Sequence, residues 1–147
     1  MGLAAVIEAV SSFLPYEATT LVGEESLAQD GTPMRIVWVP QADSFTAPQE
    51  RGNPERRSLA TRRMAVNVHL WGANLDEAET MLEGFVYALR SSLGPNYELL
   101  SGAWLGQALA ARGRVYILGI AIHVPVPEPA LGRVTITGEM QDVALQN

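Results

Sequence analysis

The fold of this chain is decided by residues 63–94, which read RMAVNVHLWG (63–72) and ANLDEAETMLEGFVYALRSSLG (73–94). Over residues 63–71, apolar side chains alternate with small or polar ones, and this period of two predicts a half-buried strand. Asn74 stands three residues before Glu77, which predicts an Asn-based capping box at the start of a helix. An apolar stripe at helical spacing continues to Leu93, and Gly94-Pro95 predicts the end of that helix.

The patterns on either side of this centre predict the remaining elements. Helical spacing predicts a short helix over residues 3–13, and apolar or β-branched runs predict strands at residues 19–22, 34–39, 97–104, 115–126 and 133–137. Strands that follow one another through short turns favour the α+β class, with a mostly antiparallel sheet of about four to five strands and two flanking helices. The length of 147 residues predicts a single domain over residues 1–147.

Two segments look irregular. Residues 41–61 are polar, contain prolines and glycines and show no periodicity, so we expect a long loop there. Residues 139–147 look like a flexible tail. The strand at residues 115–126 is apolar on both faces, which predicts burial on both sides or a face covered by another subunit. We expect Pro125, Pro127 and Pro129 to end its pairing.

The charge of the chain is unevenly distributed. All ten basic residues are arginines, and the net charge is −6. Five arginines and three acids in residues 40–63 give that segment +2, which leaves −8 for the rest of the chain. The arginines of this segment are Arg51, Arg56, Arg57, Arg62 and Arg63. They fit either a solvated loop or an arm that docks on a neighbouring copy, where arginine pairs bidentately with carboxylates.

Residues for catalysis or metal binding are scarce. The chain has no cysteine, no Gly-x-Ser-x-Gly elbow and no phosphate loop. His69 and His123 both fall in predicted strands. Because side chains alternate between the two faces of a strand, the two histidines could approach each other across the sheet, but no third ligand has suitable spacing. We therefore expect no enzymatic activity, no cofactor and no metal. The competing hypothesis is a small-ligand-binding or hydrolytic domain with a pocket around the two histidines.

The tryptophans and the start of the chain allow two further expectations. Trp38, Trp71 and Trp104 lie at or near strand ends, so they either pack in the core or anchor a partner; Trp71 and Trp104 are the candidates for anchors.

The first residues lack a basic n-region, and Glu8 interrupts their apolar stretch, so we expect a protein made in the cytosol.

The central motif also supports a family resemblance. Residues 66–72 (VNVHLWG) close a strand just before the capped helix, Ser101-Gly102-Ala103-Trp104 follows it, and the long strand at residues 115–126 ends on prolines. Over residues 33–137 this pattern of elements resembles the tail terminator (tail-completion) proteins of long-tailed bacteriophages. The segment at residues 41–61 is longer than the family pattern.

The resemblance implies a ring, most often of six copies, on the head-proximal end of the tail tube. Such a ring stops tube polymerisation and meets the neck or connector proteins, and DNA passes through its lumen without specific binding. The protein would then be located in the virion, after assembly in the host cytoplasm. Another neck or head-completion protein of the same virion is the nearest alternative. A ring needs head-to-tail contacts between two different patches of one chain, and a basic segment on an acidic body supplies such a pair.

Overall fold

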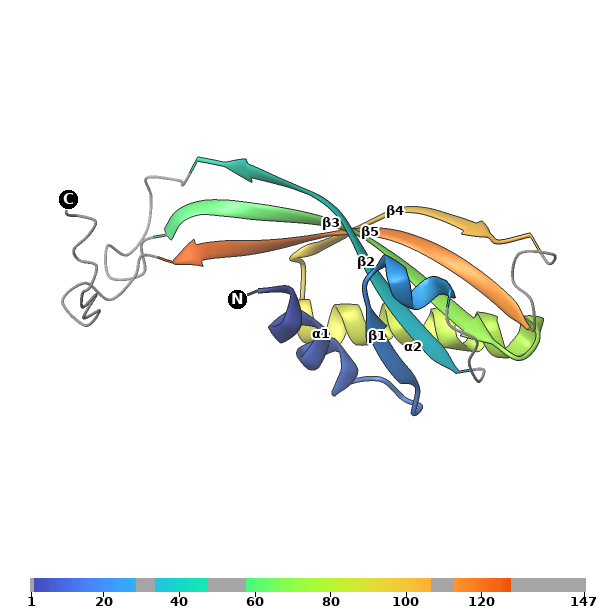
Figure 1. Cartoon of the computed structure of the whole chain (residues 1–147). Helices are drawn as coiled ribbons and strands as arrows, with labels where there is room; N and C mark the ends of the chain where they lie inside the picture. Colours follow the sequence, from blue (N-terminus) through green and yellow to red (C-terminus); the bar gives the residue numbers. More distant parts are fainter. Residues whose placement is uncertain (1, 29–33, 48–57, 107–112, 128–147) are drawn as a thin grey trace, which may run out of the picture.

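The computed structural model describes residues 2–28, 34–47, 58–106 and 113–127, and these form one sheet with helices on one face (Figure 1). In chain order the elements are α1 (Leu3–Ser11), β1 (Thr19–Val22), the 3-10 helix η1 (Glu24–Ala28), β2 (Arg35–Thr46), β3 (Ser58–Gly72), α2 (Leu75–Leu93), β4 (Tyr97–Trp104) and β5 (Arg114–Pro127). The strand order is β1-β2-β3-β5-β4, antiparallel except for the β1–β2 pair. The predicted α+β class is confirmed. The strand expected at residues 133–137 and the tail at 139–147 lie outside the described residues.

The core lies between the sheet and the two helices. The even-numbered residues of β3 from Met64 to Leu70 face this core and are almost completely buried, as the period-two pattern predicts. Helix α2 contributes Phe85, whose ring packs 5.2 Å from that of Trp38 on β2. Trp38 is 1% exposed, so it is a core residue and not a contact for a partner.

Helix α2 begins and ends as its sequence predicts. The Glu77 backbone N–H donates to Asn74 Oδ1 at 2.9 Å, and the Ala73 N–H donates to Glu77 Oε1 at 2.5 Å. The first bond satisfies a donor that the helix N-terminus leaves without an intrahelical partner, and the second ties the residue before the cap to Glu77. At the other end Gly94 adopts a φ of 61°, which a residue with a side chain rarely does.

The expected loop at residues 41–61 is wrong at both of its ends. Strand β2 continues through Pro40 to Thr46, and β3 begins at Ser58, so only residues 48–57 lie outside the described part. Beyond an irregularity between Pro40 and Ala42, the two strands pair from Ala42–Ala65 to Thr46–Thr61. All of residues 40–46 are exposed. A strand without a buried face has no alternating pattern, and sequence periodicity therefore missed it.

Pro125 and Pro127 do not end the pairing of β5 with β3, which continues to the Ser58–Pro127 pair, and Pro129 lies outside the described residues. The His123 N–H donates to the Asn96 carbonyl on the β4 side of β5, at 3.0 Å. Peptide groups alternate in direction along a strand, so the nitrogens of Pro125 and Pro127 also lie on that side. The missing N–H groups are therefore not needed for the β3 ladder.

These corrections define a strand extension, which consists of residues 40–46, 58–63 and 123–127. Figure 1 shows its three strands running well past the ends of α1 and α2. Phe45 and Leu59 are 60% and 51% exposed there. The extension is thus a three-stranded ribbon with large apolar side chains left in solvent.

A glycine-to-alanine pair tests the junction of β3 and α2. A Cβ on Gly72 would lie 2.6 Å from the Ala78 backbone nitrogen, whereas nothing lies within 4 Å of a Cβ on Gly106. We expect Gly72→Ala to lower the free energy of unfolding by about 1–3 kcal/mol, because helix α2 must shift. Gly106→Ala should change it by less than about 0.5 kcal/mol. Urea unfolding followed by circular dichroism measures both, and equal values would contradict the close approach.

Candidate interaction surface

The candidate surface comprises the strand extension and the far face of the sheet, which is the face turned away from α1 and α2. On β3 the far face carries Arg63, Ala65, Asn67, His69 and Trp71. These alternate with the buried core positions of the same strand. Two of the arginines and both histidines singled out from the sequence lie on these parts of the molecule.

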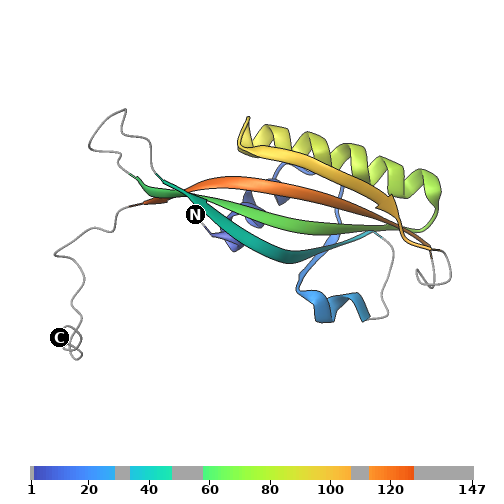
Figure 2. The same cartoon turned by 90° about the horizontal axis from the view of Figure 1, so that it is seen from above.

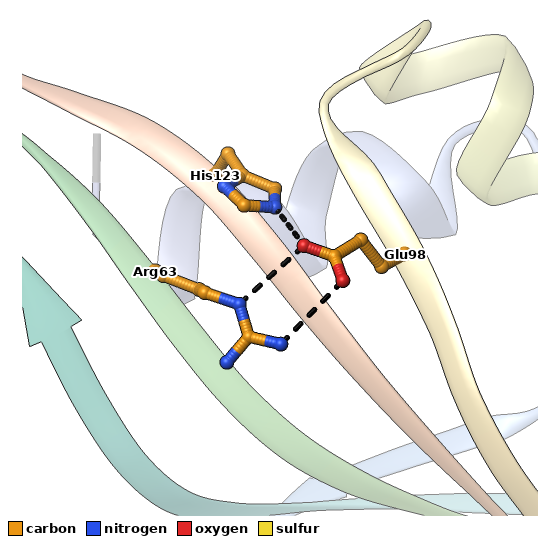
Figure 3. Close-up of polar contacts among 3 residues, drawn as sticks. All are labelled: Arg63, Glu98 and His123. Atoms are coloured by element: carbon orange, nitrogen blue, oxygen red, sulfur yellow. Dashed lines mark hydrogen bonds and ion pairs between the residues drawn. The ribbon is translucent and has the colours of Figure 1, made fainter. Parts of the chain in front are cut away.

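A charged cluster joins three strands on the far face (Figure 3). Glu98 on β4 accepts from His123 Nε2 on β5 at 2.5 Å and from Arg63 Nε on β3 at 3.4 Å. The hydrogen bonds from Arg63 and then His123 lower the pKa of Glu98 below its ordinary value. All three side chains are between 31% and 45% exposed, so the cluster contributes little to stability. It does hold the start of β4 against the two central strands.

Arg62 points to the opposite face from its neighbour Arg63. Its guanidinium donates to Asp43 Oδ2 on β2 through Nε and through Nη2, at 3.0 and 2.7 Å. The two described arginines of the basic segment therefore bind acids of their own chain while about a third of each side chain remains exposed. Arg51, Arg56 and Arg57 lie outside the described residues.

The two candidate anchor tryptophans differ in exposure. Trp71 is only 9% exposed, and the Arg35 guanidinium lies 3.9 Å from the centre of its ring. Trp104 is 40% exposed and packs edge-on against Tyr116, with ring centres 5.0 Å apart. Trp104 is thus the tryptophan with area available to a partner. Leu99 and Leu100, on the same strand, are 50% and 47% exposed.

The prediction that His69 and His123 approach each other is wrong. His69 is paired with Ile117, and His123 with Arg63. The two histidines share the far face but are separated by six residues along β3, which is about 20 Å. Burial lowers the pKa of His69, which favours its neutral form. Within the described ranges no three His, Cys, Asp or Glu side chains form a group that could hold a metal ion.

Sequence reasoning missed the acids and the apolar residues of this surface. Asp43 and Glu98 gave no signal, since each meets its arginine only through strand pairing. Phe45 lies in a segment without clear periodicity, and so does Leu99 next to this surface, on the helix side of β4; the exposure of both emerges only once the strands are placed.

The comparisons with known proteins assign no family to this chain. A scan against models of protein families finds no match, and a search of curated proteins finds no significant match. Neither of the two described α-helices is long and apolar enough to cross a membrane.

The charged cluster gives a testable pH dependence. Arg63→Gln should raise the pKa of Glu98 towards its ordinary value, because the hydrogen bond from Arg63 is the largest cause of the shift. A lowered carboxyl pKa stabilises the fold above the unfolded-state value of about 4.5, and this contribution is lost as the pH falls through the folded-state pKa. Carboxyl ¹³C NMR titration measures the shift.

The control for this titration is Arg62→Gln. Arg62 pairs with Asp43 on the opposite face, so its loss should leave the Glu98 titration unchanged. A Glu98 pKa that is the same in the parent protein and in Arg63→Gln would contradict the cluster.

Proposed function

We propose that this chain is a structural virion protein, a tail terminator that forms a ring on the head-proximal end of a phage tail tube. The ring stops tube growth and presents a surface to the neck or connector proteins. The sequence resemblance motivates the proposal. The α+β architecture, with a strand leading directly into a capped helix and then into two further strands, fits it.

The observation that carries the proposal is the strand extension. Residues 40–46 are all exposed, and Phe45 and Leu59 leave about half or more of their surface in solvent. Large apolar side chains on a ribbon beyond the helical layer leave much of their surface in water, and they lose that contact when another chain covers them. The extension therefore favours a protein that works by contact with other chains.

The distribution of charge supports contact between copies. Residues 40–63 carry a net charge of +2 and the rest of the chain −8. A head-to-tail contact brings two different patches of one chain together, and opposite charges favour that contact over a like-to-like one. The acidic remainder of the chain also suits a lumen through which DNA passes without binding.

The proposal predicts a closed assembly that caps tubes. The purified protein should show a single ring-sized mass by multi-angle light scattering at high concentration. When it is added to growing tubes of the virion's own tube protein, electron microscopy should show rings at one tube end and shorter tubes. Serum albumin at the same concentration is the control for crowding. A protein that stays monomeric at all concentrations and leaves tube length unchanged would contradict the proposed function.

A further inference from the structure

The edges of the sheet differ in their capacity to accept another strand. Among the described residues, no strand pairs with the outer side of β4, nor with β2 beyond Trp38 on the side away from β3. Unpaired N–H and C=O groups at such edges are templates for another chain, and proteins block them with prolines, short strands or irregularities. The direction of each peptide group shows which N–H groups of an edge point outward and which prolines remove them.

The edge of β5 in the strand extension is blocked. Residues 123–127 run past the first residue of β4, so that side of β5 has no partner strand there. The N–H groups that would point outward belong to Pro125 and Pro127, which have none. At the other end of the strand order, β1 is only four residues long.

The edge of β4 can donate hydrogen bonds. Asn96 and Leu105, which flank the strand, both bond towards β5. Allowing for the irregularity between Leu99 and Ser101, alternation directs the peptide groups of Tyr97, Leu99, Gly102 and Trp104 outward. None of these is a proline.

The second open edge belongs to β2 in the strand extension. The Trp71 carbonyl accepts from Met34 on the β2 side of β3, so the odd residues of β3 face β2. The pairs Ala42–Ala65 and Ser44–Arg63 are therefore the hydrogen-bonded ones. The peptide groups of Asp43 and Phe45 point outward, and both retain their N–H.

The geometry points to a second copy of this chain as the occupant of the β4 edge: we infer that β2 of one copy, around Phe45, pairs with β4 of the next copy, around Leu99. The inference rests on the proposed ring and deepens it by naming the contact between copies. Successive antiparallel pairs make β4 run opposite to β2. Two copies in the same orientation can therefore join β4 to β2 as a further antiparallel pair, with the sheet continuing from one copy to the next.

Apolar side chains match across this joint. Leu99 is paired with the core residue Ile120, and Phe45 is paired with Arg62, two residues from the core residue Met64. Both Leu99 and Phe45 thus lie on the helix side of the sheet, where they are 50% and 60% exposed. In a continuous sheet they face the same side and cover each other.

Charge selects the same partner. Seen from above, α2 runs along the side of the sheet that ends in β4 (Figure 2). The outward residues of α2 include the exposed acids Asp76, Glu79 and Glu83. The described residues of the incoming segment, 40–47 and 58–63, carry two arginines and one acid, Arg62, Arg63 and Asp43. An isologous β4–β4 contact would instead bring two acidic helices together.

The absence of native cysteine makes the contact directly testable. Within one chain β3 and β5 separate β2 from β4, so residues 45 and 99 are at least about 14 Å apart. A disulfide needs Cα atoms within about 7 Å, and a bond between these positions must therefore join two copies. We expect the Phe45→Cys/Leu99→Cys protein to form a reducible ladder of multimers on mild oxidation, at least about tenfold faster than its control.

The control protein is Phe45→Cys/Leu75→Cys. Leu75 is nearly as exposed as Leu99, at 45% and 50%. It lies at the start of α2 beside Gly72, six residues along β3 from Val66, the residue level with Leu99. A Phe45/Leu99 ladder no faster than this control would overturn the inference. So would rapid dimers of Leu99→Cys alone, which indicate a β4–β4 contact. A ladder that appears only after the chain is shortened to end at Pro127 would also overturn it, because residues 128–147 would then be the natural occupant of the edge.

A proline variant tests the joint without cysteine. Phe45→Pro removes an outward N–H that the β3 ladder does not use, so the monomer should keep its circular dichroism spectrum while self-association weakens about tenfold in sedimentation. Phe45→Val is the matched control for the lost ring. Self-association that is unchanged in Phe45→Pro overturns the inference.

The outcomes also separate the two proposals. Rings without cross-links between residues 45 and 99 refute this contact alone, whereas cross-linked closed multimers that never bind tubes refute the proposed function alone.

Discussion

The backbone ladder between β3 and β5 is the interaction on which the rest of the structure depends. It runs from the Gly72–Arg114 pair to the Ser58–Pro127 pair without losing its antiparallel register, apart from one irregularity near Ser58. Over the part of its length that α1 and α2 cover, the ladder positions core residues such as Val68 and Ile120. Over the rest, the same two strands carry the strand extension, which has no helix beneath it. Because both parts belong to the same strands, the folding of the core fixes the direction in which the extension points.

The direction of individual peptide groups then decides which edges of this sheet can still pair with another strand. Pro125 and Pro127 lie where their missing N–H groups do not affect pairing with β3 and deprive the outer side of β5 of donors. Pro40 follows the same rule on β2, because Trp38, two residues earlier, bonds towards β1. Asp43 and Phe45 on β2, and Leu99 on β4, keep their outward donors. Within the described residues, proline placement thus closes the outer side of β5 and leaves β4 and the β2 part of the strand extension available to another chain.

The part of the sheet that the helices cover could be predicted from its sequence, whereas most of the strand extension could not. Alternation in β3 and the Asn74–Glu77 cap follow from burial and from local hydrogen bonds, both of which leave a pattern along the chain. Residues 41–46 form a strand that has no buried face, so their side chains carry no period. The alternation of side chains along a strand placed His69 and His123 on one face of the sheet but gave no distance between them. The Arg63–Glu98 contact depends on the register of three strands, which no single segment encodes.

The positions of the two open edges also restrict the kind of assembly. The proposed β4–β2 contact would use one edge of each copy and leave its other edge open, so a chain of copies would end only by closing on itself. Across the paired strands Leu99 is level with Val66, and Phe45 is level with Arg62. Pairing Leu99 of one copy with Phe45 of the next would therefore shift the two copies by four residues along the strands. A sheet closes into a barrel only with such a shift, because tilted strands require a staggered register. If the shifts did not close, the same contact would generate a helical filament. A protein that terminates a tube must form the closed alternative, since a filament would keep adding copies instead of ending the tube.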